Sequence, residues 1–330
     1  MFLQNKYVYH YCSVETFLSI IQNSCLWMGN IRHSNDLTER VPLINALCRQ
    51  LTDAISPNLS FSDSARLKEI MTQFQEDAQG TYNPCYATCF SFQPDLLSQW
   101  RGYADNGAGV AIGFHRDYFA SCSSQLPALF ACPIEYLPPN GPIPDSIKNL
   151  PSFELHFQQI KALIQEVIQI PFDQPGYPAT DEQHERFSKL ITKIQSYFED
   201  LLSIANFYKS IAFQEEAEFR LAFSTSANLR EVDDTIYAPD FSAVFPDHFS
   251  ISSAKFRYAR GQLQPYCEFS FAPRKQSIIG EIRLGPKCTL KASDIYYLLA
   301  MNGYLPKDPI FPDRYSTKNI QIIPSSVPYC

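Results

Sequence analysis

The chain contains 330 residues, of which 45% are hydrophobic and 18% are charged, and its formal net charge at pH 7 is −7. This composition can bury a hydrophobic core, and it excludes a coiled coil or a disordered chain. The acidic balance argues against a general coat on nucleic acid. The sequence has no run of about 18 apolar residues and does not begin like a signal peptide, so we expect a cytoplasmic protein without a membrane partner.

The first predicted elements are a strand and two helices. Residues 7–12 read YVYHYC, and this alternation predicts a strand with tyrosines on one face and His10 on the other. Residues 15–23 follow as a short amphipathic helix. The polar stretch 33–39 precedes a helical pattern over 41–55, so it acts either as a helix cap or as a functional loop.

The second group of elements is a strand over 86–92, a short helix over 95–104 and a strand over 109–114. Glycines between positions 107 and 113 nearly match a dinucleotide-binding fingerprint. Their spacing is wrong, however, and they lead into a strand instead of a helix. We therefore reject a Rossmann-type site here.

A helical hairpin is predicted in the middle of the chain. Amphipathic patterns cover 153–170 and 181–209, with a proline-containing loop at 171–178 between them. We interpret 150–208 as a helical insertion. Helices and strands alternate too irregularly for a doubly wound sheet, so the predicted fold class is α+β, with one domain over 1–330 and a single mixed or antiparallel sheet. The strands expected in this sheet cover 7–12, 86–92, 109–114, 217–223 and 278–284.

A charged motif interrupts the apolar run of residues 216–223, which read EAEFRLAF. On a strand, Glu216, Glu218 and Arg220 would share one face, because side chains two positions apart point the same way. Two carboxylates flanking a guanidinium can hold a sugar hydroxyl or steady a developing cation. On a helix, Glu216 and Arg220 would instead form an ordinary surface ion pair.

The ten cysteines are scattered, mostly among apolar or aromatic neighbours. In a reducing compartment this pattern indicates buried thiols. Cys85 and Cys89 have the spacing of half a zinc site, but no second close pair follows them. We therefore expect no metal cofactor.

Several short motifs follow one another along most of the chain. They are Tyr9-His10-Tyr11, Leu26-Trp27, Asn35-Asp36 with Glu39, Phe90-Ser91, Trp100 with Tyr103, Gly109 to Phe114, Lys209, Glu216-x-Glu218-x-Arg220 and Ile282-x-Leu284-Gly285-Pro286. In these motifs the chain resembles a bacterial family named only as domain of unknown function 2971. It departs from the family pattern at Leu37, where proline is common, and at His10, where a basic residue is common.

The order of these motifs is also similar to that of ADP-ribosyltransferases. This resemblance implies that His10 touches the nicotinamide ribose, Ser91 supports the nicotinamide pocket and Glu218 is the catalytic carboxylate, with Glu216 two residues before it. It implies NAD as the substrate, for ADP-ribosyl transfer or NAD hydrolysis, with a protein or nucleic-acid acceptor. A toxin or defence effector would have such an activity.

The same resemblance suggests further contacts with NAD. Tyr11, Trp100 or Tyr103 would form an aromatic wall for its base. Arg101 or the basic segment 255–291 would meet the pyrophosphate. Arg220 would lie in the strand that lines the ligand.

An alternative is a non-catalytic or nucleic-acid-binding module that uses the segment 255–291. This segment holds eight basic and two acidic residues, although it could also be a solvated face. In the nucleic-acid interpretation its aromatic residues stack on bases, and Glu218 and Arg220 form a structural ion pair. The aromatic residues concerned are Phe256, Tyr258, Tyr266 and Phe269. Convergence of His10, Ser91 and Glu218 would favour the enzyme.

Overall fold

The computed structural model describes residues 5–31, 41–80, 85–138, 140–170, 180–224, 230–232, 235–237, 241–311 and 313–329. Contacts divide the chain into two compact units. The first unit comprises Met1–Asn35, Pro84–Ile134 and Phe213–Cys330. The second comprises Asp36–Asn83 and Glu135–Ala212. The predicted loops 33–39 and 171–178 lie outside the described residues. That the whole chain forms a single domain stays a prediction.

The first unit contains most of the strands. Its strands are β1 (Tyr7–Cys12), β2 (Cys25–Asn30), β3 (Cys85–Ser91), β4 (Val110–His115), β5 (Leu129–Pro133), β8 (Glu218–Ser224), β9 (Arg230–Val232), β10 (Thr235–Tyr237), β11 (Ala243–Phe245), β12 (Phe249–Ile251), β13 (Lys255–Ala259), β14 (Gln262–Ser270), β15 (Ile279–Leu284) and β16 (Gln321–Pro324). Its α-helices are α1 (Val14–Asn23), α4 (Leu97–Tyr103), α5 (Arg116–Ser123), α9 (Lys275–Ile278) and α10 (Ala292–Met301). The short 3-10 helix η5 (Ile211–Glu216) leads into β8.

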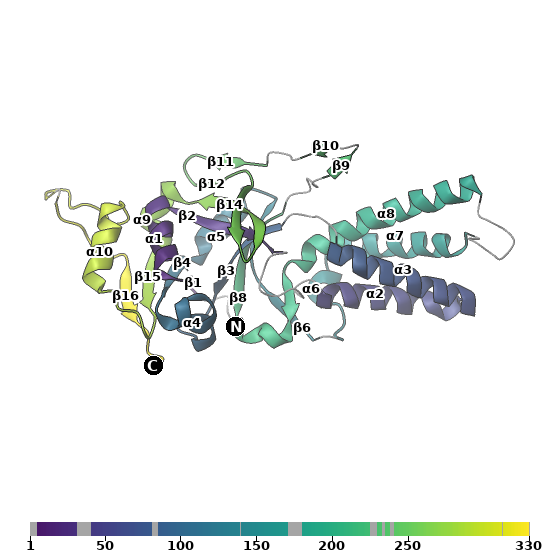
Figure 1. The fold of residues 1–330 in the computed structure, drawn as a ribbon, viewed down its shortest axis with the longest axis horizontal. Coiled ribbons are helices and arrows are strands. Elements are labelled where there is room, and N and C mark those ends of the chain that lie inside the picture. Colours follow the sequence, from purple (N-terminus) through teal and green to yellow (C-terminus); the bar gives the residue numbers. More distant parts are fainter. Residues whose placement is uncertain are drawn as a thin grey trace. The chain divides into compact units, whose positions relative to one another are not determined.

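Twelve of the strands form one sheet, in the order β11-β12-β14-β2-β3-β1-β4-β15-β16, with β13 beside β14 and the pair β8–β5 beside β3. The pairs are antiparallel except β15–β16, which is parallel. Figure 1 shows β16 alongside β15, with α10 next to this edge of the sheet. The predicted α+β class with a mixed, mostly antiparallel sheet is confirmed.

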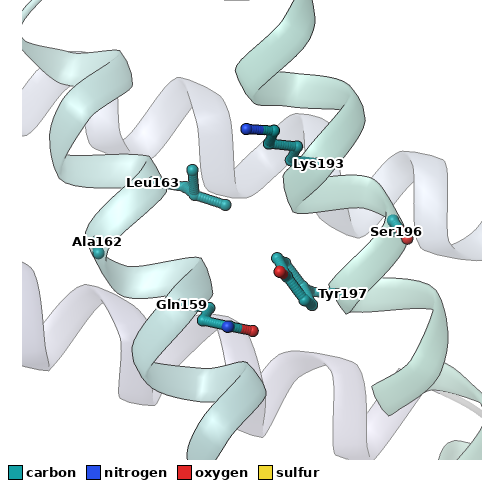
Figure 2. Close-up of a pocket in the computed structure, with 6 residues that line it drawn as sticks. All are labelled: Gln159, Ala162, Leu163, Lys193, Ser196 and Tyr197. Atoms are coloured by element: carbon teal, nitrogen blue, oxygen red, sulfur yellow. The ribbon is translucent and has the colours of Figure 1, made fainter.

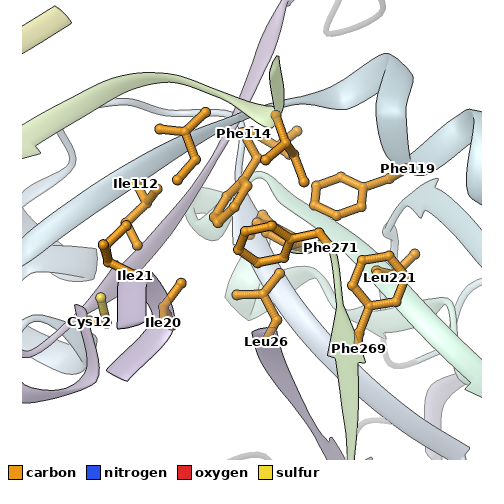
Figure 3. Close-up of a cluster of buried hydrophobic side chains, with 14 of the residues drawn as sticks. Cys12, Ile20, Ile21, Leu26, Ile112, Phe114, Phe119, Leu221, Phe269 and Phe271 are labelled. Atoms are coloured by element: carbon orange, nitrogen blue, oxygen red, sulfur yellow. The ribbon is translucent and has the colours of Figure 1, made fainter. Parts of the chain in front are cut away.

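One face of this sheet carries the main hydrophobic core, because alternate residues of its strands point to the same side. The Phe90 ring contacts the rings of Phe119 and Phe219, at centroid distances of 4.9 and 6.1 Å. Figure 3 shows Phe114, Phe119, Phe269 and Phe271 gathered with aliphatic side chains from α1 and neighbouring strands. This cluster occupies one face of the sheet and leaves the opposite face to polar and aromatic residues.

The register aligns one residue from each of five strands across that opposite face. Tyr9 pairs with Ser91 on one side and with Gly113 on the other. Ser91 in turn pairs with Glu218, and Gly113 pairs with Glu281. Paired residues in antiparallel strands point to the same face. We call this set of residues the polar row.

The second unit is mainly helical. Its elements are α2 (Val41–Ile55), α3 (Phe61–Gly80), β6 (Glu135–Leu137), α6 (Asp145–Lys148), α7 (Pro151–Ile168), α8 (Asp181–Ala205) and β7 (Tyr208–Ser210). Figure 1 shows α2, α3, α7 and α8 side by side, and they share one hydrophobic core. Helix α8 begins with a capping box, in which Thr180 and Gln183 bond each other's backbone. The predicted helices over 41–55 and 153–170 are confirmed by α2 and α7. The helix predicted over 181–209 is confirmed as α8 up to Ala205, but Tyr208 and Lys209 belong to strand β7.

Candidate functional site

Glu218 and Arg220 form a buried ion pair at the start of β8. The Arg220 Nε and Nη2 atoms lie 2.8 and 2.7 Å from the Glu218 Oε1 atom. The two side chains are only 3% and 0% exposed. Glu218 and Arg220 share one face of β8, whereas Phe219 and Leu221 lie on the other face, in the hydrophobic core. This arrangement agrees with the predicted strand alternation. Removing one partner of such a pair leaves an uncompensated buried charge.

Glu216 does not continue this strand, which corrects the prediction of a row containing Glu216, Glu218 and Arg220. It ends the 3-10 helix η5, and Ala217 has a φ of +44°, which breaks the extended conformation. Strand β8 therefore begins only at Glu218. Glu216 still lies nearby, since Phe92 N donates to the Ala217 carbonyl oxygen at 2.8 Å.

Ser91 joins the end of β3 to this turn. Its Oγ donates to the Glu216 carbonyl oxygen at 2.7 Å and accepts from Gln93 N at 3.0 Å. The side chain is buried and pairs across the strands with Glu218. The structure therefore brings Ser91 and both glutamates together, and it gives the serine hydroxyl a positioning role.

His10 points to the other face of the sheet. Its Nδ1–H donates to the Cys89 carbonyl oxygen at 3.1 Å, and its ring lies 5.7 Å from the ring of Phe90 in the hydrophobic core. Burial lowers the pKa of His10, which favours the neutral imidazole. The predicted convergence of His10, Ser91 and Glu218 does not occur, because Tyr9, and not His10, pairs with Ser91.

Tyr11 and Trp100 form a buried aromatic pair with ring centroids 4.7 Å apart. The Tyr11 hydroxyl donates to the Gln93 carbonyl oxygen at 2.8 Å and accepts from Leu96 N at 3.1 Å. Burial is the main cause that raises the pKa of Tyr11. Neither ring is open to solvent, so neither provides an exposed wall for a ligand base.

Tyr103 is the member of the predicted aromatic set that reaches the surface. Its side chain is 42% exposed, and its hydroxyl donates to the Glu216 Oε1 atom at 3.3 Å. Tyr103 therefore connects α4 to the turn that holds Glu216 and Ser91. An exposed ring beside a carboxylate can stack on a planar ligand while its polar end stays hydrogen-bonded.

Arg101 lies on a different side of α4. Residues two positions apart in a helix diverge by about 200°. The Arg101 guanidinium lies 5.4 Å from the centre of the Tyr329 ring, and Lys287 Nζ lies 4.1 Å from the same ring. The Tyr329 hydroxyl donates to Asn106 Oδ1 at 2.6 Å. Arg101 thus belongs to a separate cationic cluster beside the C-terminal segment.

A second Glu-x-Arg pair on the same face was missed in the sequence. Arg283 Nε donates to Glu281 Oε1 on β15, and Tyr9 hydrogen-bonds to both side chains. Burial, followed by the Glu281 charge, raises the pKa of Tyr9 to about 12. The signal was present in the run IIGEIRL, which repeats the alternation seen around Glu218.

The zinc site considered from the sequence is not assembled. Cys85 and Cys89 lie in one extended strand, four residues and thus about 13 Å apart along the chain, which is too far to share a metal. Within the described ranges, no group of three or more His, Cys, Asp or Glu could hold a metal ion.

A pocket of about 410 Å³ lies in the second unit, between α7 and α8 (Figure 2). Its lining residues are Gln159, Ala162, Leu163, Lys193, Ser196 and Tyr197. None of the predicted site residues is among them.

Comparisons with known proteins identify one domain. Residues 99–221 match a family described as "Protein of unknown function (DUF2971)", so this range is a DUF2971 domain. It includes Tyr103, Glu216, Glu218 and Arg220. A search of curated proteins and a search of solved structures each gave no significant match. Across the described part of the chain, no helix combines the length and apolarity needed to cross a bilayer.

Proposed function

We propose that the chain binds NAD or another ligand containing ADP-ribose beside Tyr103, Glu216 and Glu218, and that it cleaves the nicotinamide glycosidic bond. One observation carries the proposal. The Ser91 hydroxyl fixes the backbone of Glu216 directly before the buried Glu218–Arg220 pair. The Glu216 carboxylate thereby lies beside the exposed Tyr103, two residues before Glu218 in the chain.

The chemistry explains why two carboxylates suit this reaction. Cleavage of the glycosidic bond passes through an oxocarbenium-like state, which a fixed carboxylate stabilises electrostatically. The bond between ribose C1′ and the nicotinamide nitrogen breaks, and its electron pair returns to the ring, which leaves as neutral nicotinamide. An acceptor hydroxyl, from water or a second substrate, then bonds to C1′ and gives its proton to a carboxylate.

The structure suggests a role for each side chain. Arg220 holds Glu218 in one orientation, as preorganised electrostatic stabilisation requires. Glu216 is the more exposed carboxylate and is suited to take the acceptor proton. Tyr103 offers its exposed ring to the ligand base. His10 and Trp100 have no direct role in this proposal, because neither reaches this surface.

Titration calorimetry with NAD and ADP-ribose tests the binding step, and nicotinamide release tests cleavage. We expect heat of binding for the unmodified chain and at least a tenfold loss of nicotinamide release in Glu216→Gln. Tyr103→Ala should weaken binding, whereas Tyr103→Phe should retain most of it, because the ring is kept.

Glu281→Gln is the matched control. It makes the same change of residue type in the same sheet, four strand spacings or about 19 Å from Glu218. It should leave nicotinamide release unchanged. Absence of any binding heat with both ligands, or equal losses in Glu216→Gln and Glu281→Gln, would overturn the proposal.

A further inference from the structure

Strands β13 and β14 form a hairpin with a preorganised tip. The two-residue turn, Arg260 and Gly261, has φ values of +54° and +77°. Positive φ at both positions is the geometry that matches the natural twist of paired strands. A turn of this kind holds the flanking side chains in fixed positions.

On one face of the hairpin, the side chains contact one another and Trp27 of the neighbouring strand β2. The ring of Trp27 on β2 lies 4.4 Å from the ring of Tyr266, and the Arg257 guanidinium lies 5.9 Å from the Trp27 ring. Lys255 Nζ lies 2.7 Å from a carboxylate oxygen of Glu268. The cations Lys255 and Arg257 on this face are therefore already engaged in contacts.

That opposite face carries an exposed apolar cluster. Phe256, Tyr258 and Leu263 are 63%, 77% and 67% exposed, and Tyr258 and Leu263 are cross-strand partners. Further along β14, Cys267 on the same face enters the hydrophobic core. The hairpin therefore extends past the hydrophobic core, and within the described chain its two aromatic rings are largely exposed. Exposed apolar clusters of this kind mark interaction surfaces.

Only two of the four aromatic residues considered from the sequence can take part. Tyr266 and Phe269 are buried in the sheet, so they cannot stack on a ligand. Phe256 and Tyr258 lie two residues apart on one strand face, roughly 7 Å from each other. This arrangement offers two neighbouring stacking surfaces.

The charge near these rings indicates the chemical class of the partner. Arg260 lies in the turn that follows Tyr258, and no acidic residue occurs between Asp247 and Glu268. Lys255 and Arg257 lie on the other face of the strand, where they contact Glu268 and Trp27. The chain as a whole is acidic, so this segment is a local exception. Two exposed aromatic rings with a cation in the adjoining turn match single-stranded nucleic acid, whose bases stack while its phosphates meet the cation.

We propose that the β13–β14 hairpin binds single-stranded nucleic acid through Phe256, Tyr258 and Arg260. This binding surface stands independently of the NAD proposal. Duplex nucleic acid is a poorer fit, because its bases are already stacked on one another and expose only their edges.

Fluorescence anisotropy with labelled 15-nucleotide oligo-dT and oligo-U, measured with the full chain, tests the proposal. We expect binding at low salt that weakens as salt rises, since counterions are released from the phosphates. Tyr258→Ala and Phe256→Ala should each weaken binding about fivefold or more, whereas Tyr258→Phe should retain it. Arg260→Gln should make the salt dependence less steep.

Tyr297→Ala is the matched control, because Tyr297 is 69% exposed on α10, away from the hairpin in the sequence. It should leave binding unchanged. Three results would overturn the proposal: no binding to either oligonucleotide at low salt, equally tight binding of a duplex, or equal losses in Tyr258→Ala and Tyr297→Ala. A dimer in sedimentation that Tyr258→Ala dissociates would assign the surface to a second copy of the chain.

Discussion

Arg220 approaches a single carboxylate oxygen of Glu218 with two nitrogens, at 2.8 and 2.7 Å, inside the first unit. We expect Glu218→Ala to lower the free energy of unfolding by about 3–5 kcal/mol, because Arg220 would remain buried without this carboxylate. Glu218→Gln should cost less, since its amide oxygen can still accept from Arg220. Urea denaturation measures both changes. Equal losses in the two variants would contradict this reasoning.

Glu281→Ala should destabilise the chain less than Glu218→Ala. The two pairs have the same spacing on the strand, but the Arg283 side chain is 20% exposed whereas Arg220 is fully buried. Water can therefore solvate Arg283 after its partner is removed. Comparing the urea midpoints of the two variants checks this order.

Asp95 connects α4 to the C-terminal segment. It accepts hydrogen bonds from Trp100 Nε1, Ser325 Oγ, Ser326 N and Ser326 Oγ, at distances of 2.6 to 2.9 Å. Burial acts to raise the pKa of Asp95, but these hydrogen bonds outweigh it and hold the pKa below its usual value. A carboxylate whose pKa is lowered by folding stabilises the folded state above its unfolded pKa, about 3.9.

The stabilisation from Asp95 should accordingly disappear as the pH falls below about 4. Asp95→Asn should be less stable than the unmodified chain at pH 7, and the difference should shrink towards pH 3. Thermal unfolding across this pH range measures the effect. A difference that stays constant with pH would show that the charge of Asp95 is unimportant.

Phe119 belongs to the phenylalanine cluster in Figure 3 and is fully buried, with its ring centroid 5.8 Å from that of Phe114 and 6.0 Å from that of Phe269. Phe119→Ala should reduce the free energy of unfolding by about 3–5 kcal/mol, through lost burial and the cavity that remains. The exposed Tyr297→Ala should change it by no more than about 0.5 kcal/mol. Denaturation of the two variants compares a core aromatic residue with a surface one.

Gly113 separates Tyr9 from Glu281 in the polar row. A Cβ atom at this position would lie 3.0 Å from Tyr9 Cε1 and 3.1 Å from Glu281 Cβ. Gly113→Ala should therefore displace one of these side chains and destabilise the chain by about 1–3 kcal/mol. Combining it with Tyr9→Leu, which removes the ring edge nearest the new methyl group, should recover part of that loss.

Much of the local structure was predictable from the sequence. The alternation in residues 7–12 predicted β1 with its correct bounds, and the helical pattern over 41–55 predicted α2. These predictions succeeded because burial on one side of a strand or helix leaves a regular apolar pattern in the chain. The pattern also assigned Glu218 and Arg220 to one face of a strand.

The bend at Ala217 was not predictable, because an alanine does not indicate a positive φ. The sequence likewise gave no sign that Trp100 is buried against Tyr11 while Tyr103 is exposed. Both outcomes depend on how α4 packs against strands that are distant in the chain. Propensity and periodicity describe only the near neighbours of a residue.

The sequence by itself determined that the chain is of the α+β class and carries Glu218 and Arg220 inside an apolar strand. Only the tertiary structure decided which residues meet: Tyr9, and not His10, beside Ser91, and the Glu218 and Glu281 pairs on one face of one sheet. The physical reason is strand register. A shift of one residue reverses every side chain between the two faces, and register is set by pairing between segments that lie far apart in the sequence.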